Sequence, residues 1–580
     1  MSKLLPSEYT LGIGDVTHDP SVCLMKGNQI LVAIELERLT RIKHNLKLDP
    51  TCYTILDQGK HVQSILKKRT VKFREEQFFL GIQYCLEYAA IEFSEISDIV
   101  TSTLYEKPIF SKNSIFIEHH HAHSASTFYP SIFDEAAILT VDGYGFLEKD
   151  GSARSVMFAH GKNNTIDILD NIFGYHNHTA EELEQGAHGS HIVFANSLGA
   201  FYQNISILVG MGYQGEGKTM GLASYGSDNK DFLPIREYIN FLTTGKLEID
   251  NRGIFLYVSN LLNSAKEKLS PQEFFQYQAD LAFAAQQLLE EMIIHLALYL
   301  HKLTNSTNLC LAGGVALNSV ANAKILKKTP FKNIFIQPAA GDSGIALGCS
   351  LHGAHAIKDF PRYYLKNKKI FSPFLGKDYK DSALNINAYN NIKEYQIMLD
   401  RKDIFHEVAK LISNKKIIGW FNSRSEIGPR ALGNRSILAD PRDPNMKNIL
   451  NAKVKFREGF RPFAPAILEE SAEKYFEDVT FSPHMLLVTK AKSISKNEIP
   501  SVIHVDNTAR LQTVNSELSP DFYQLIKKFE SITGIPVLLN TSFNIAGQPI
   551  VETPDEAIEC FLNSQIDGLF LNGEFFLKPS

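Results

Sequence analysis

The feature that most limits the fold of this chain is an apolar segment that runs into an acidic turn and then continues as a hairpin. Residues 11–14 are apolar, residues 15–21 are rich in turn formers, and apolar character returns at residues 22–25. A Gly27-Asn28 pair then precedes a further apolar run at residues 30–34. Short apolar runs bounded by such turns indicate β-strands, so we predict a nested hairpin near the N-terminus.

The same arrangement occurs a second time along the chain. Residues 136–141 are apolar and end in Asp142-Gly143-Tyr144-Gly145. A second hairpin candidate follows across Gly151 and residues 155–159. Two strand-to-acidic-turn units of this kind predict an internal duplication.

A third apolar segment, residues 309–311, leads into a glycine pair. Gly313 and Gly314 are followed by Asn318 and by a helical run at residues 320–326. A glycine turn between a strand and a helix N-terminus presents backbone N–H groups and the positive end of the helix dipole to bound anions. The pattern therefore predicts an α/β fold with a loop that faces phosphate or a nucleotide.

The length of 580 residues favours two or three domains. Residues 360–391 are polar and rich in Lys, Asn and Tyr, which is typical of a linker. We place the boundary near residue 384, which gives domains at 1–384 and 385–580. In the second domain we expect one helix and two strands, at residues 404–412, 417–421 and 535–540.

Composition excludes several classes of protein. The formal net charge of −5 provides no general basic surface for a phosphate backbone, so nucleic acid is not an expected partner. The longest apolar stretches are too short to span a bilayer, and the N-terminus does not resemble a signal peptide. Six dispersed cysteines without CxxC spacing are typical of reduced thiols. We expect a cytoplasmic protein that needs no membrane.

Four histidines between residues 119 and 123 open a predicted helix. Positions four apart lie on one helix face, so His119 and His123 can bind the same metal ion. Asp142 and Asp342, which each follow a predicted strand, would complete a set of two histidines and two carboxylates. Such a set suits Fe(II), Mn(II) or Zn(II). The alternative is an exposed polyhistidine patch, which remains the interpretation of the two histidines between them.

The stretch at residues 210–226 is dense in glycine around Glu216 and Lys218. Loops of this composition let the backbone approach a phosphate or substrate closely. The stretch contains Gly217-Lys218-Thr219 but does not satisfy the spacing of a Walker A loop. An ordinary turn is the alternative for this segment.

Basic residues recur beside glycine and proline turns in the second domain. They lie in residues 424–435, in residues 453–463 and at Arg510, and the polar segment 540–544 follows. These cations alternate with apolar residues instead of lining a polar helix face, which argues against simple solvated charges. The pattern predicts a site for a polyanion such as ATP together with a phosphorylated donor.

As a set, these motifs resemble the O-carbamoyltransferases of nodulation-factor and antibiotic tailoring. The resemblance runs from about residue 11 to about residue 572. It is carried by His18-Asp19 and by residues 35–44, 119–129, 215–226, 313–318, 424–440, 461–466 and 541–554. It implies a duplicated ribonuclease-H-like, actin-like first domain similar to the threonylcarbamoyl transferase TsaD. It also implies a second α/β domain similar to YrdC.

The resemblance also implies an activity and its residues. The second domain would convert carbamoyl phosphate and ATP, with Mg²⁺, to carbamoyl-adenylate, and the first would transfer the carbamoyl group to a hydroxyl of a small molecule. The implied metal, usually iron, would be bound by His119, His123, Asp142 and Asp342. His18, our candidate general base, and Lys43 would lie at the transfer site. The nucleotide and donor would be bound by Gly313, Gly314, Asn318, Arg430, Lys455, Arg461, Arg510, Ser542 and Asn544.

One position departs from the family pattern. The family usually has Glu directly after Gly145, where this chain has Phe146. The difference points to another acceptor pocket. The acceptor itself, a hydroxyl on an antibiotic, toxin, lipo-oligosaccharide or surface glycan, stays open, as does the oligomeric state. The competing interpretations are a transfer-RNA threonylcarbamoyl transferase and an actin-like or chaperone-type ATPase.

Overall fold

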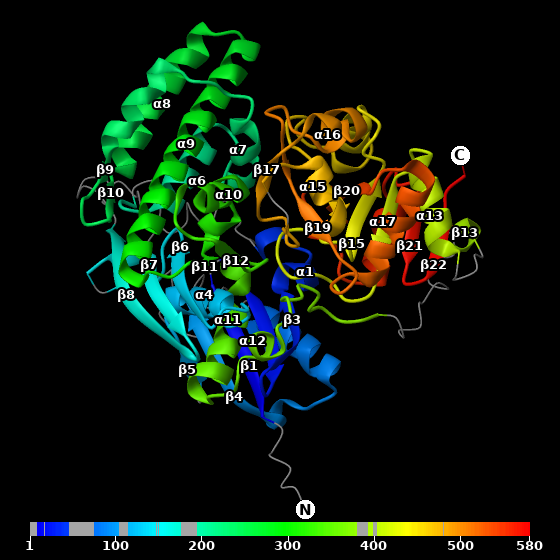
Figure 1. Cartoon of the computed structure of the whole chain (residues 1–580), viewed down its shortest axis with the longest axis horizontal. Coiled ribbons are helices and arrows are strands. Elements are labelled where there is room, and N and C mark those ends of the chain that lie inside the picture. The colour runs from blue at the N-terminus through cyan, green and yellow to red at the C-terminus, as the bar shows by residue number, and fades with distance from the viewer. Residues whose placement is uncertain are drawn as a thin grey trace, which may run out of the picture. The chain divides into compact units, whose positions relative to one another are not determined.

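The computed structural model divides the chain into two compact units, unit 1 at Met1–Phe371 and unit 2 at Ser372–Ser580 (Figure 1). It describes residues 8–16, 18–45, 75–103, 114–146, 148, 150–175, 194–379, 392–397, 403–478 and 481–579. The predicted boundary at residue 384 lies outside the described residues. The segment before it already belongs to unit 2, because the Gly376 N–H donates to the Ser425 carbonyl at 3.0 Å and Phe374 forms a β-bridge with Glu426.

The predicted linker is wrong at its N-terminal end. Helix α12 spans Tyr363–Asn367, and Arg362 just before it is buried. The Arg362 guanidinium donates to carbonyl oxygens of Phe128 at 2.7 Å and of Phe133 at 2.9 Å. The polar composition of this segment therefore suggested a linker, although hydrogen bonds from Arg362 to distant backbone carbonyls hold the segment against the rest of unit 1.

The first sheet of unit 1 contains the predicted nested hairpin. Its strand order is β3-β2-β1-β4-β5. β1 pairs antiparallel with β2, and β2 antiparallel with β3, whereas β1–β4 and β4–β5 are parallel. The strands are β1 (Tyr9–Asp15), β2 (Ser21–Lys26), β3 (Gln29–Glu35), β4 (Ile96–Thr103) and β5 (Ser114–Phe116).

The second sheet repeats this topology. Its order is β12-β11-β6-β7-β8, with β6–β7 and β7–β8 antiparallel and β6–β11 and β11–β12 parallel. The strands are β6 (Glu135–Val141), β7 (Ser152–Lys162), β8 (Thr165–Tyr175), β11 (Asn308–Ala312) and β12 (Asn333–Ile336). Both sheets thus place a three-stranded antiparallel meander beside two parallel strands, which is the predicted duplication of topology.

Two helices lie between the sheets and bring the halves of unit 1 together. They are α4 (His119–Phe128) and α11 (Ile345–His352), and Figure 1 shows both near the centre of the unit. A Cβ added to Gly348 would lie 1.9 Å from the Ala122 carbonyl oxygen, and one added to Gly12 would lie 2.0 Å from the Ala346 carbonyl oxygen. Only glycine allows contacts this close, so these positions hold α4, α11 and β1 in tight packing.

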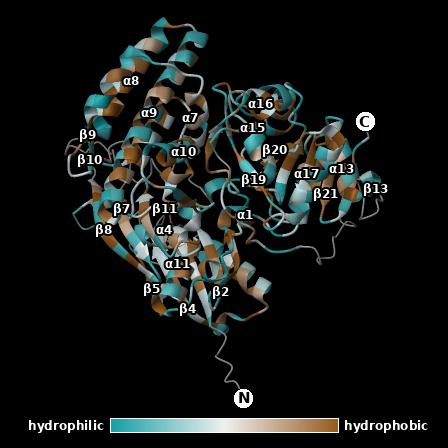
Figure 2. Cartoon of the chain, in the orientation of Figure 1, coloured by the Kyte–Doolittle hydropathy of each residue, from teal (hydrophilic) through white to brown (hydrophobic). Residues whose placement is uncertain are grey.

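The remaining helices of unit 1 include one apolar enough to resemble a membrane span. Among the described residues, α9 (Pro271–Thr304) is long and apolar enough to cross a membrane by length and composition alone. However, 61% of its most apolar 18-residue segment is buried within the fold. Its polar residues Gln286 and Glu290 are also buried. Figure 2 shows hydrophilic and hydrophobic residues alternating along α8 (Asn251–Lys268) and α9. The burial is that of a core helix. Further helices of unit 1 include α1 (Leu36–Thr40), α6 (Leu198–Leu208), α7 (Glu216–Ala223) and α10 (Ser319–Lys328).

Unit 2 is built on an eight-stranded mixed sheet of order β13-β22-β21-β14-β15-β20-β16-β19. The predicted helix and strands are confirmed as α13 (Ile404–Ser413), β14 (Ile418–Phe421) and β20 (Val537–Ser542). The strands are β13 (Gln396–Ile397), β14 (Ile418–Phe421), β15 (Arg435–Ala439), β16 (Ala464–Leu468), β19 (Gln512–Val514), β20 (Val537–Ser542), β21 (Gly568–Leu571) and β22 (Glu574–Leu577). The main helices are α13 (Ile404–Ser413), α17 (Pro520–Thr533) and α18 (Pro554–Leu562). Both units are therefore mixed α/β.

Candidate metal centre and anion site

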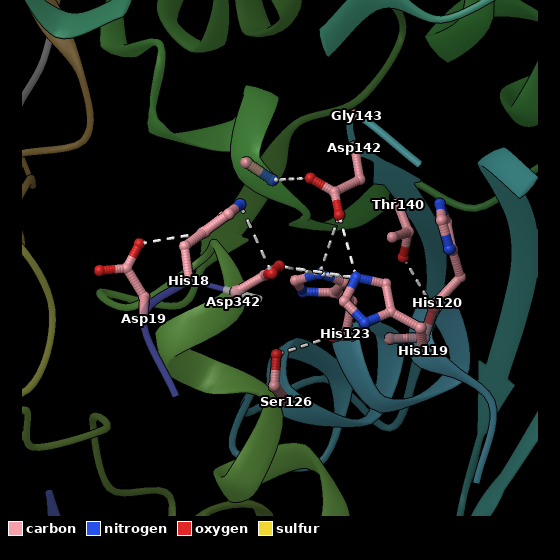
Figure 3. A network of polar contacts seen from close by, with 12 residues as sticks. His18, Asp19, His119, His120, His123, Ser126, Thr140, Asp142, Gly143 and Asp342 are labelled. Carbon is pink, nitrogen blue, oxygen red and sulfur yellow. Dashed lines mark hydrogen bonds and ion pairs between the residues drawn. The ribbon is translucent and has the colours of Figure 1, made fainter. Parts of the chain in front are cut away.

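Four side chains converge at one end of the two inner helices (Figure 3). His119 and His123 project from the first turns of α4, Asp142 follows β6, and Asp342 precedes α11. All four are buried, and each offers a ligand atom within 4.8 Å of the others. The sequence-predicted set is thus assembled in space from segments far apart in the chain.

The donor atoms have the spacing of a metal site. His119 Nε2 lies 3.2 Å from His123 Nε2, 3.0 Å from Asp142 Oδ2 and 3.5 Å from Asp342 Oδ1. His123 Nε2 lies 3.4 Å from each of the same two oxygens. Metal–ligand bonds of about 2.1 Å in a tetrahedron put the ligand atoms roughly 3.4 Å apart. The arrangement can therefore hold a divalent cation.

The charges in this cluster favour a bound cation. Burial by itself lowers the pKa of His123, but Asp142 and Asp342 outweigh it and raise the pKa to about 9. Burial raises the pKa of the Asp142 carboxyl, yet hydrogen bonds from His119 and His123 hold it well below its usual value. Two buried carboxylates beside two imidazoles need positive charge, either as protons or as a metal ion.

The predicted glycine turn supports this cluster. The Gly314 N–H donates to Asp142 Oδ1 at 2.9 Å, which leaves Oδ2 facing the histidines. Gly313 has φ of +91°, and a Cβ there would lie 2.2 Å from the Val141 carbonyl oxygen. In this structure the glycine pair thus holds the Asp142 carboxylate, and its contact with a nucleotide remains a prediction.

His18 lies at the edge of the cluster, with Nε2 3.8 Å from Asp342 Oδ2. Burial lowers the pKa of His18, but the carboxylates of Asp342, Asp19 and Asp142 outweigh it and raise the pKa to about 10. Lys43 is exposed on the short helical turn Lys43–Asn45. The structure therefore brings His18 to the predicted centre.

Asn318 is part of a buried polar network. Its Oδ1 caps α10 by accepting from the Ala321 N–H at 3.0 Å, and its Nδ2 donates to Gln286 Oε1 at 2.9 Å. Tyr202 donates to the same oxygen at 2.6 Å. Burial also raises the pKa of Glu216, in the glycine-rich stretch that begins α7. Asn318 is thus engaged within the fold, and its role toward a nucleotide stays a prediction.

The first part of the predicted anion site in unit 2 is a lysine held by a polar loop. Lys455 is 4% exposed, and its Nζ donates to Asn544 Oδ1 at 2.7 Å and to Ser542 Oγ at 3.2 Å. It also donates to the carbonyl oxygens of both residues. These oxygens are neutral, so they solvate the ammonium group without cancelling its charge. The structure brings all three predicted residues together.

The second part is a group of arginines that repel one another. Burial, and then Arg461, lower the pKa of Arg430 to about 10. Burial, and then Arg430, Arg457 and Arg461, hold the pKa of Arg510 well below its usual value. The Nε atoms of Arg430 and Arg510 are buried and have no hydrogen-bond partner in the part of the chain that the structure describes. A bound anion would relieve this repulsion.

Arg457 is a member of this group that the sequence analysis did not select. Its Nε donates to Asn451 Oδ1 at 3.1 Å, and its guanidinium lies over the Phe463 ring, 4.4 Å from the centroid. Burial and the nearby Arg461 lower its pKa to about 9. Its spacing of four residues from Arg461 was the available signal. We define the arginine cluster as Arg430, Arg457, Arg461 and Arg510.

Phe146 is half-buried where the family pattern has Glu. It follows Gly145, at which a Cβ would lie 3.0 Å from His120 Nδ1.

His120 is fully buried and is not among the four converging donors. The polyhistidine segment is therefore not an exposed patch, because burial places His120 in the packing beside the cluster.

These observations define the class of the protein. It is a two-unit α/β protein with a buried histidine–aspartate centre in one unit and an arginine cluster in the other. The chain belongs to the carbamoyltransferase family. The model of the carbamoyltransferase N-terminus matches residues 86–351, and that of the C-terminus matches residues 409–578. The protein is therefore an enzyme that transfers carbamoyl groups.

Several relatives align over most of the chain. An uncharacterised protein of Synechocystis is 33% identical over 99% of this chain and 97% of its own length. Nodulation protein NolNO of Sinorhizobium fredii is 32% identical over 97% and 79%, and nodulation protein NolO of Bradyrhizobium diazoefficiens is 36% identical over 80% and 79%. A crystal structure of HypF with phosphate and nucleotide is 12% identical over 60% of this chain and 56% of that chain, with a TM-score of 0.39.

Proposed function

We propose that the protein is an ATP-dependent O-carbamoyltransferase that moves a carbamoyl group from carbamoyl phosphate, through carbamoyl-adenylate, to a hydroxyl of a small natural product or sugar. The observation that carries this proposal is the presence of two chemically different sites in two units. The arginine cluster suits the phosphorylated substrates, and the histidine–aspartate centre suits the transfer. The resemblance to O-carbamoyltransferases of nodulation-factor tailoring, together with the nodulation proteins among the relatives, supports a small-molecule acceptor.

The donor step fits the residues of unit 2. Water hydrolyses carbamoyl phosphate to carbamate and phosphate, and a carbamate oxygen then attacks the α-phosphorus of ATP while pyrophosphate leaves. Both leaving groups carry charge that Arg430, Arg461 and Arg510 would offset through charge-assisted hydrogen bonds. Lys455, held by Ser542 and Asn544, would supply a fixed positive charge on one side of the donor. ATP would enter with Mg²⁺.

The transfer step fits the residues of unit 1. The acceptor hydroxyl attacks the carbamoyl carbon, AMP leaves with the electron pair of the broken C–O bond, and the hydroxyl proton moves to a base. His18 is the proposed base, because it lies beside Asp342 at the edge of the cluster. Although burial lowers its pKa, the carboxylates of Asp342, Asp19 and Asp142 raise it. A cation held by Asp342 and Asp142 would offset their charge and favour the neutral imidazole that can accept a proton. Lys43 would neutralise charge on the departing AMP. Gly313, Gly314 and Asn318 would lie against the nucleotide.

His119, His123, Asp142 and Asp342 would hold Fe(II) or another first-row divalent metal. Such an ion supplies Lewis-acid stabilisation of charge on phosphate and carbonyl oxygens. Unit 1 would be a TsaD-like, duplicated ribonuclease-H-like domain, and unit 2 a YrdC-like domain. The repeated strand order of the two sheets supports the first assignment.

The products of ATP test the proposal. Purified protein incubated with ATP and carbamoyl phosphate should form AMP and pyrophosphate, and omission of carbamoyl phosphate should stop both. ADP as the sole nucleotide product would contradict the adenylate route.

A further inference from the structure

Asp19 lies between two histidines and touches both. Its Oδ2 is 3.1 Å from His18 Nδ1, and its Oδ1 is 2.9 Å from His44 Nδ1. The Asp19 N–H also donates to the His44 carbonyl oxygen at 3.1 Å. The last two of these contacts join the turn after β1 to the turn after helix α1 (Leu36–Thr40).

The backbone at this junction is held in an uncommon conformation. Asp19 has a φ of 52° and His44 has a φ of 54°. Both values lie in the left-handed region, which residues other than glycine rarely adopt. Glu37 on α1 stabilises the second turn, since its Oε2 accepts from the His44 N–H at 2.6 Å. Strain of this kind persists only where surrounding contacts enforce it, and it is common at functional sites.

The same three residues, Asp19, Glu37 and His44, have ligand atoms close enough to bind a metal. Their atoms are already used within the protein. Both Asp19 oxygens face imidazoles, and a Glu37 oxygen accepts a backbone N–H. The geometry is that of a hydrogen-bonded clamp and not of an open coordination site.

The clamp fixes the orientation of the His18 ring. With Nδ1 against Asp19, Nε2 faces the histidine–aspartate centre, 3.8 Å from Asp342 Oδ2 (Figure 3). A carboxylate at Nδ1 favours the tautomer with hydrogen on Nδ1, which leaves the Nε2 lone pair for a proton from the acceptor. The same carboxylate stabilises the imidazolium that forms when the hydroxyl proton arrives at Nε2.

We propose that Asp19 and His44 are positioning residues that hold His18 with Nε2 directed at the acceptor hydroxyl. The inference rests on the proposed function, in which His18 accepts that proton. His44 acts through Asp19, because its Nδ1 contact keeps the carboxylate in place against His18.

Two probe nucleophiles separate positioning from folding. Glycerol at high concentration serves as a hydroxyl acceptor that needs a base, and hydroxylamine serves as a nucleophile that attacks activated carbonyls without one. Carbamoylated glycerol and hydroxyurea are measured by mass spectrometry with the full-length, metal-loaded protein, ATP and carbamoyl phosphate. Asp19→Asn should slow glycerol carbamoylation by about a hundredfold or more, the usual scale of general-base assistance. Hydroxyurea formation should change by less than about threefold, since hydroxylamine bypasses the base.

The His44 variants supply a matched pair. In His44→Asn the amide can still donate to Asp19, and Asn tolerates left-handed backbone, so glycerol carbamoylation should stay close to wild type. His44→Ala, which lacks the donor, should lose about tenfold or more, the scale of one hydrogen bond to a charged group. An equal loss with both nucleophiles in Asp19→Asn, or a His44→Asn variant as impaired as His44→Ala, would overturn the positioning role. A wild type that forms neither product would instead contradict the proposed function.

Discussion

The backbone N–H of Gly314 and the carboxylate of Asp142 are joined at 2.9 Å, so one oxygen of a candidate metal ligand is fixed by main chain and the other is left for the histidines. Hydrogen bonds of this kind to a ligand commonly strengthen metal binding tenfold to a hundredfold, an order of magnitude taken from other metal sites. A small change at Gly314 should therefore alter the affinity of this centre for a metal ion.

We predict that Gly314→Ala weakens metal binding by about tenfold. The added Cβ would lie 3.0 Å from Asp142 Oδ1 and push the carboxylate away from its position. Metal titration of the apo-protein measures the effect. Gly341→Ala is the matched control, because its Cβ would meet Leu317 Cδ1 at an ordinary 3.6 Å although Gly341 directly precedes Asp342. Equal affinities in the two variants would show that the contact does not orient the carboxylate.

We predict about one first-row metal ion per chain in freshly purified protein, as expected for one closed donor set. The double variant His119→Ala, His123→Ala should lose it, because two of the four converging donors are removed. Elemental analysis provides the measurement. His121→Ala serves as the control, since His121 packs against His352, with ring centroids 4.9 Å apart, and is not among those donors. Metal retained in the double variant would rule out this centre.

Anions should stabilise the protein through the arginine cluster. Burial and three neighbouring arginines lower the pKa of Arg510, so the charged cluster is under repulsion in the folded protein. Pyrophosphate should raise the Tm by relieving it, and the rise should grow with concentration as mass action requires. The Arg510→Leu variant should show a smaller rise and, without ligand, a Tm no lower than that of wild type. A thermal shift series with sulfate as the weaker anion checks both outcomes.

The two half-reactions should separate by mutation. Lys455→Ala should abolish donor-dependent pyrophosphate release, because loss of one charge-assisted partner costs about 2 to 4 kcal/mol by analogy with oxyanion donors. His18→Ala should leave that release largely intact, since the proposed base is needed only when the hydroxyl attacks. Pyrophosphate assays on both variants decide the matter. Equal loss in the two would place His18 in adenylate formation or in folding.

Local sequence patterns predicted the parts of the structure that depend on nearby residues. The nested hairpin near β1 and the helix that carries His119 and His123 follow from spacing and turn chemistry, and both are present. The prediction that these histidines lie together with Asp142 and Asp342 rested on two grounds. The two carboxylates follow predicted strands, and the family resemblance implies the same four residues. The structure brings the four together, and their binding of a metal stays a prediction.

Contacts between distant residues were not available from such patterns. Asp19 and His44 are separated by 25 positions and meet because two turns fold against each other. Composition predicts that Arg362 lies in a linker, yet it donates to the carbonyl oxygens of Phe128 and Phe133, more than two hundred residues earlier in the chain. Arg457 sits in a visible basic run, but its share in the repulsion at Arg510 depends on packing that composition does not encode.

The repeated topology of unit 1 has one more consequence. The two histidines come from the helix that follows the first sheet, whereas Asp142 and Asp342 come from the second repeat. The equivalent strand end in the first repeat, Asp15, instead accepts from the Thr103 hydroxyl at 2.9 Å. Neither repeat alone holds a complete set of ligands. An ion at this centre would act as a cross-link between the halves, and any motion that parted them would open the coordination sphere before it disturbed either sheet.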